Sequence, residues 1–149
     1  MVPGITAAAG CSAYAGIPLT HRDLVSSCRF ITGHLQHDGA LDLPWQSLAD
    51  SSQTLVFYMG LANLELITQR LMAAGLAADT PAALISRGTC RDQQVLRGHL
   101  AQLPVLASQC SLATPTLTVI GKVVGLFAQH AVRYPAHFAG AALELEVTP

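Results

Sequence analysis

Three short apolar runs constrain the fold of this chain more than any other feature. They span residues 53–59, 82–85 and 116–121, and each is nearly continuous in apolar and β-branched side chains. Runs of this length without polar alternation predict strands that are covered on both faces. Residues 61–75 and 100–107 carry apolar side chains at helical spacing instead. Buried strands that alternate with helices predict an α/β fold with a mixed, largely parallel sheet flanked by helices.

Weaker signals complete the expected elements. Residues 29–33 and 93–98 are typical of two further strands, and residues 45–49 favour one or two helical turns. Residues 7–15 consist almost entirely of small side chains and follow a threonine, Thr6, that can cap a helix. We expect a helix there, and its lack of bulk would let its backbone approach another surface or a ligand closely.

Composition narrows the class of protein. The chain has 149 residues, which suits one domain or one piece of a larger enzyme. Apolar residues make up 51% and charged residues only 11%, so the chain can bury a core and is not intrinsically disordered. The 8 lysines and arginines are scattered, which argues against a nucleic-acid partner. Such low charge indicates that a partner subunit or a further domain covers part of the surface.

Neither a membrane span nor a secretion signal is expected. A spanning helix needs about 20 consecutive apolar residues, and the best candidate, residues 117–132, is interrupted by Lys122, Gln129 and His130. The first residues lack the basic stretch of a signal peptide. We therefore predict a cytoplasmic protein.

The four cysteines favour reduced thiols. They stand at positions 11, 28, 90 and 110, and no two are spaced as a metal-binding or redox-active pair. An apolar chain of this length needs no disulfide to fold, so we expect four buried, reduced thiols and a cytosolic compartment.

The sequence lacks the common catalytic signatures, including the Walker loop and the zinc-protease and serine-hydrolase motifs. His34 and His37 have a spacing that could hold a metal, but only Asp38 stands nearby as a further ligand. Surface histidines are the favoured interpretation, and no metal site is predicted.

Three other positions have two interpretations each. Arg22, in Thr20–Asp23, offers a fork that matches carboxylates, or lies in a solvated loop with a local Arg–Asp pair. Met59 ends a buried strand where α/β sheets bind ligands, yet local sequence favours a core residue. Gly88 lies in a turn after the next strand and, taken alone, indicates only a turn.

In combination, the motifs of this chain resemble the uroporphyrinogen-III C-methyltransferases, a group of tetrapyrrole methylases that includes the methyltransferase module of siroheme synthase. The similarity extends over residues 2–125. The matching segments are Val2–Ala8, Gly10–Asp23, Thr32–His34, Thr54–Gly60, Pro81–Leu84 and Val119–Gly121.

The resemblance implies an enzyme of two domains that works as a homodimer and binds S-adenosylmethionine between its domains. It implies methylation of two pyrrole carbons of uroporphyrinogen III to give precorrin-2, without a metal. It also implies that Thr6, Ala7, Met59 and Gly88 contact the cofactor and that Arg22 holds the substrate.

This chain lacks several segments of the family pattern, and their absence determines which domain and which catalytic residues are expected. Residues 1–125 are expected to be the second domain and residues 126–149 an atypical tail, helical or disordered. The glycine-rich loop and the proton acceptor and donor proposed for the family have no counterpart here, so catalytic residues are expected in a missing first domain. Where the family has Glu-Asn-Gly-Thr, this chain has Ser86–Thr89.

The isolated chain is therefore expected to be inactive. Two alternatives within the family are a methylase of another corrin precursor and a non-catalytic fragment that keeps only the dimerisation surface. An α/β binding module unrelated to methylation is the most distant alternative.

Overall fold

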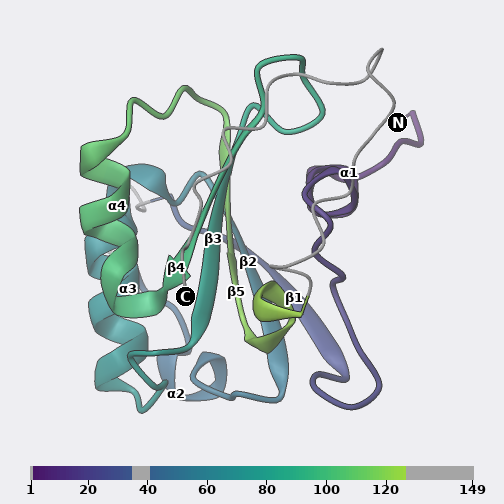
Figure 1. The fold of residues 1–149 in the computed structure, drawn as a ribbon. Coiled ribbons are helices and arrows are strands. Elements are labelled where there is room, and N and C mark those ends of the chain that lie inside the picture. The colour runs from purple at the N-terminus through teal and green to yellow at the C-terminus, as the bar shows by residue number, and fades with distance from the viewer. Residues whose placement is uncertain (1, 35–40, 127–149) are drawn as a thin grey trace, which may run out of the picture.

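Five strands form one sheet, and helices cover both of its faces (Figure 1). The structure is a computed structural model that describes residues 2–34 and 41–126. The strands are β1 (Ser27–Thr32), β2 (Gln53–Tyr58), β3 (Pro81–Ser86), β4 (Gln94–His99) and β5 (Thr116–Ile120). The α-helices are α1 (Ala7–Tyr14), α2 (Trp45–Leu48), α3 (Leu64–Ala73) and α4 (Leu103–Gln109). Short 3-10 helices span Leu61–Asn63 (η1), Leu100–Gln102 (η2) and Lys122–Gly125 (η3).

The order of the strands across the sheet is β1-β2-β5-β3-β4. β1 pairs with β2 in parallel, with Phe30 opposite Val56. The β2–β5, β5–β3 and β3–β4 pairs are all antiparallel. Because β5 runs against both of its neighbours, β1, β2 and β3 all point in the same direction.

The α/β class, the mixed sheet and the flanking helices are confirmed, but the expectation of a largely parallel sheet is wrong. Apolar runs report that a strand is buried on both faces and carry no information on its direction. Direction follows from the connections, because a short turn can join only antiparallel neighbours. Residues 87–93 join β3 to β4 directly, and β5 then inserts between β2 and β3.

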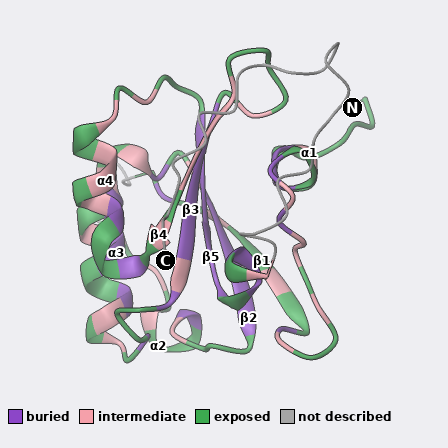
Figure 2. Cartoon of the chain, in the orientation of Figure 1, coloured by how far each residue is buried: buried purple, intermediate pink, exposed green. Residues whose placement is uncertain are grey.

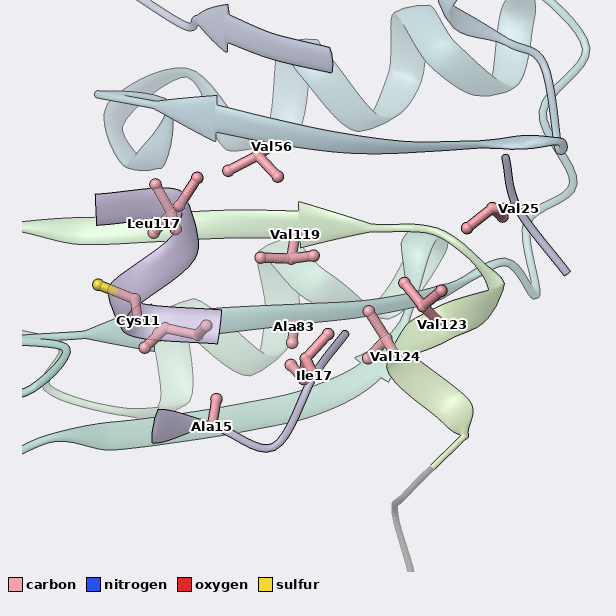
Figure 3. Packing of buried hydrophobic residues seen from close by; sticks show 12 residues of the cluster. Cys11, Ala15, Ile17, Val25, Val56, Ala83, Leu117, Val119, Val123 and Val124 are labelled. Atoms are coloured by element: carbon pink, nitrogen blue, oxygen red, sulfur yellow. The ribbon is translucent and has the colours of Figure 1, made fainter. Parts of the chain in front are cut away.

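Each face of the sheet has its own buried core (Figure 2). Leu55 and Phe57 point from β2 toward the face that α2, α3 and α4 cover. Val56 points to the opposite face, where α1 packs. Figure 3 shows this second core, in which Cys11 of α1 and Ala15, just after α1, lie against the sheet. The side chains of α1 are small, so its backbone lies close to the strands.

The helices of the described ranges are all too short or too polar to cross a membrane. The expected tail lies outside the described residues from position 127 onward.

Candidate active-site edge

The carboxyl ends of three strands meet at one edge of the sheet. β1, β2 and β3 point the same way, so Gly33, Met59 and Arg87 follow their last residues on a common side. In α/β folds, ligands bind at the carboxyl ends of strands. We call this border, made by residues 32–34, 58–60 and 86–89, the carboxyl edge.

Strained backbone is concentrated at the carboxyl edge. Met59, Arg87 and Thr89 have positive φ angles of 54°, 48° and 69°, and they are the non-glycine residues with positive φ in the described ranges. The left-handed region is costly for residues with a Cβ, most of all for β-branched threonine. Strain of this kind tends to gather at functional sites, where the surrounding structure maintains it.

Side chains hold the turn after β3 in this strained shape. The Arg87 guanidinium lies 2.7 Å from the Asp92 carboxylate, and the Thr89 amide donates to Gln93 Oε1 over 2.7 Å. The Arg87 amide donates to the Pro115 carbonyl over 2.9 Å, which fixes the turn to the segment before β5. These three interactions fix the conformation of the turn.

The N-terminus of α1 lies over the carboxyl edge. The Tyr58 hydroxyl accepts a hydrogen bond of 2.8 Å from the Ala8 amide and also hydrogen-bonds to Thr6 Oγ1. Thr6 and Ala7 are exposed, and so is Met59, which is 61% accessible. The structure thus brings the segment with Thr6 and Ala7 to Tyr58, the last residue of β2, which immediately precedes Met59.

Gly88 meets α1 from the β3 side. A Cβ built on Gly88 would lie 2.3 Å from Cys11 Sγ and 2.8 Å from Cys11 Cβ. Burial raises the pKa of the Cys11 thiol, and the nearby Cys90 raises that pKa further. Cys11 is therefore a packing group rather than a nucleophile. The close approach observed at Gly88 is to Cys11, and its predicted contact with a cofactor stays a prediction.

Arg22 lies apart from these residues. It belongs to the exposed turn in which His21 bridges to Val25, and the next residue, Ser26, donates to Ser52 just before β2 begins. This turn is at the amino ends of β1 and β2, on the opposite edge of the sheet. In the same turn Asp23 lies 3.9 Å from His21 Nδ1. The structure does not bring Arg22 together with Met59 or Gly88.

The described residues hold no cluster of three or more potential metal ligands. His34 is exposed after β1, while His37 lies outside the described residues. All four cysteines are free thiols, and burial raises the pKa of Cys28 as well as that of Cys11. The expectation that all four are buried is wrong, because Cys28 and Cys110 are half-buried and Cys90 is exposed.

The family model of the tetrapyrrole (corrin/porphyrin) methylases matches residues 1–104. The chain belongs to this family. The carboxyl edge and the N-terminus of α1 therefore form part of a tetrapyrrole methylase fold.

Individual tetrapyrrole methylases support the assignment. A siroheme synthase from Pseudomonas fluorescens SBW25 is 59% identical over 126 residues, which are 85% of this chain and 27% of that protein. The crystal structure of uroporphyrin-III-C-methyltransferase from Thermus thermophilus has a TM-score of 0.70 at 39% identity and covers 86% of this chain and 53% of that one. A uroporphyrin-III C-methyl transferase from T. thermophilus, complexed with S-adenyl homocysteine, has a TM-score of 0.69 at 24% identity. This match covers 85% of this chain and 51% of that one, and it shows the shared fold.

The chain thus spans 27% of the length of the siroheme synthase that it matches.

Sequence reasoning missed two residues that hold the ends of α1, Tyr58 at the carboxyl edge and Arg97 on β4. Tyr58 holds the N-terminus of α1, and the Arg97 guanidinium donates to the Ala15 carbonyl just after α1 ends. A polar tip at the end of an apolar strand was the only sequence signal for Tyr58.

Proposed function

We propose that this chain supplies the second half of the active-site cleft of an S-adenosylmethionine-dependent C-methyltransferase. Its substrate would be uroporphyrinogen III and its product precorrin-2, in siroheme and cobalamin biosynthesis. The observation that carries the proposal is the strained carboxyl edge, where Tyr58, the neighbour of Met59 in the chain, hydrogen-bonds to Thr6. The names of similar proteins, siroheme synthase and uroporphyrin-III-C-methyltransferase, support the choice of reaction.

The residues at the carboxyl edge fit the proposed cofactor. Met59 offers an exposed thioether, a soft and uncharged wall for a sulfonium group. Thr6 and Ala7 leave the backbone before and within α1 open to an adenosine-sized ligand. S-adenosylmethionine, when bound, would supply an electrophilic methyl group. The chain would hold the reacting groups in line, which is where most of the rate enhancement of such a displacement arises.

Arg22 is proposed to bind the substrate. Its exposed guanidinium can form two parallel hydrogen bonds with one carboxylate. Because it lies at the opposite edge of the sheet from Met59, it would hold a peripheral carboxylate and take no part in methyl transfer. Residues 1–125 would form the second domain of the family, and the base that removes the ring proton would come from the first.

S-adenosylhomocysteine should bind this chain saturably, with one ligand per chain. Met59→Ala should lower the affinity by at least about tenfold, or about 1.4 kcal/mol, because it removes the thioether wall. Isothermal titration calorimetry measures both values.

Val105→Ala is the matched control, since Val105 is also an exposed apolar residue, at 56%, but lies on α4 across the sheet. It should leave the affinity unchanged. Absence of binding to the unaltered chain would contradict a cofactor site on this half alone, and would mean that the site needs both halves or has decayed to a non-catalytic fragment.

This chain alone should not methylate uroporphyrinogen III. The resemblance assigns the proton acceptor and donor to the first domain, and binding without them cannot complete the reaction. Mass spectrometry of the tetrapyrrole after incubation with S-adenosylmethionine checks this expectation. A mass increase equal to one or two methyl groups would contradict it, and methylation of another corrin precursor would identify a different methylase of the family.

We also propose that the chain works as a homodimer in the cytoplasm. Phe30 on β1 is 55% exposed, and Ile5 before α1 is 85% exposed. The family resemblance supports the dimer, and these two side chains offer apolar surface for a partner to cover. Light scattering that gives the mass of a single chain would contradict the dimer.

A further inference from the structure

The N-terminus of α1 lacks a cap from its own sequence. Thr6 occupies the capping position, with φ −65° and ψ 145°, but its side chain makes no capping hydrogen bond. A capping threonine ordinarily accepts from an amide of the first helical turn. Only Ala8, Cys11 and Ser12 of α1 are buried, so hydrophobic packing fixes this end of the helix weakly.

Tyr58 performs the capping from another part of the chain. Its hydroxyl accepts from the Ala8 amide over 2.8 Å and hydrogen-bonds to Thr6 Oγ1, across 50 and 52 positions of sequence. The ring is half-buried and packs edge-on against Phe30, with centroids 6.3 Å apart and an interplanar angle of 64°. Because the ring is held in this way, the position of the hydroxyl is fixed relative to the sheet.

The same tyrosine immediately precedes Met59, whose φ of 54° turns the chain away from β2. One side chain thus joins the last residue of β2 to the segment that contains Thr6 and Ala7. We propose that Tyr58 is a positioning residue, whose hydroxyl sets the spacing between Met59 and Thr6–Ala7 for an adenosyl ligand. The inference rests on the proposed function, and it assigns Tyr58 no direct contact with the ligand.

The other end of α1 has a separate attachment. The Arg97 guanidinium, on β4, donates to the Ala15 carbonyl. Cys11, between the two ends, lies against Gly88. Removal of the Tyr58 hydroxyl should therefore release only the first turn of α1 and leave the helix docked.

Tyr58→Phe tests this inference, because it deletes the hydroxyl and keeps the ring that packs on Phe30. The affinity for S-adenosylhomocysteine should fall about tenfold, and hydrogen exchange of the Ala8 amide should accelerate by a similar factor. Calorimetry measures the first and NMR the second. Exchange of amides in β2 and β5 should stay unchanged, which shows that the sheet is intact.

The partner of the hydroxyl offers an independent variant. Thr6→Val removes Oγ1 and should also lower the ligand affinity, whereas Thr6→Ser keeps Oγ1 and should preserve it. The Ala8 amide keeps its hydrogen bond to Tyr58 in both variants, so its exchange should stay slow. Ser12→Ala is the control, because it removes a hydroxyl from the same helix that makes no hydrogen bond.

The outcomes separate the inference from the proposed function. Weaker binding together with faster Ala8 exchange supports both. Unchanged ligand affinity in Tyr58→Phe overturns the positioning role and leaves the cofactor site in place. Absence of ligand binding to the unaltered chain overturns a cofactor site on this half alone, and the positioning role falls with it.

Discussion

Gly88→Ala should lower the free energy of unfolding of this chain by about 3 kcal/mol, at the upper end of the usual cost of overpacking. The added Cβ would lie 2.3 Å from Cys11 Sγ and 3.3 Å from Cys11 Cα. Rotation of the thiol would not relieve the clash, because Cys11 Cβ is itself only 2.8 Å away. α1 would have to move off the sheet, and Thr6 and Ala7 would move with it. Denaturant titration measures the loss of stability, and calorimetry should show a loss of S-adenosylhomocysteine binding.

Gly10→Ala is the control for Gly88→Ala. Gly10 lies on α1, and a Cβ there meets only ordinary contacts, with Thr89 Cγ2 3.6 Å away. Alanine within a helix should be neutral or stabilising by up to about 1 kcal/mol. Cys11→Gly combined with Gly88→Ala should recover part of the loss, because it removes both nearest atoms. Equal destabilisation by Gly10→Ala and Gly88→Ala would show that the fold tolerates no side chain near this helix and would refute the specific clash.

The local elements of the fold are readable from the sequence. The apolar runs at 53–59, 82–85 and 116–121 match β2, β3 and β5 to within one residue at each end. The small-residue run at 7–15 is α1, and its close approach to the sheet follows from the absence of bulky side chains. These features depend on neighbouring residues, which is the range over which periodicity and composition carry information.

Contacts between distant segments were not readable. Tyr58 and Ala8 are 50 positions apart, and Arg97 and Ala15 are 82 positions apart. A simple alternation of strands and helices suggests parallel pairs. The insertion of β5 between β2 and β3 makes its two pairs antiparallel instead. That insertion still leaves β2 and β3 pointing the same way, so Met59 and Gly88 reach one edge for a reason the sequence did not reveal.

The candidate site was predictable only by family resemblance. Local sequence favoured a core role for Met59 and a plain turn at Gly88. The structure shows an exposed Met59 with positive φ, so the local interpretation as a core residue is wrong. Gly88 does lie in a turn, as local sequence indicated, and its missing side chain also makes room for Cys11. For Arg22, nearness in sequence was misleading. Its motif stands near Thr6 in the sequence, but its turn lies at the other edge of the sheet.

A second tight glycine contact fixes the ends of β1 and β2. Gly33→Ala should lower the free energy of unfolding by about 2–3 kcal/mol. Its Cβ would lie 2.6 Å from Gly60 Cα, a backbone atom that cannot rotate away. Gly33 also cannot withdraw, because its amide donates to the Tyr58 carbonyl over 2.7 Å and its carbonyl accepts from Asn63 Nδ2 over 2.8 Å. Denaturant titration monitored by circular dichroism measures the change.

Gly60→Ala provides the comparison at the same contact. Its Cβ would meet Ile67 Cδ1 and Phe57 Cβ, each at 3.2 Å, and Ile67 Cδ1 is the movable end of a side chain. The cost should be about 1 kcal/mol, and Ile67→Val should relieve part of it by removing that methyl group. The same Ile67→Val change should relieve only the 3.1 Å contact of the Gly33 Cβ with Ile67 Cδ1 and leave most of the cost of Gly33→Ala, because the closest clash is with Gly60 Cα. Full rescue of Gly33→Ala by Ile67→Val would show that the ends of β1 and β2 can separate, and Tyr58 and Met59 would then not be held in place at the end of β2.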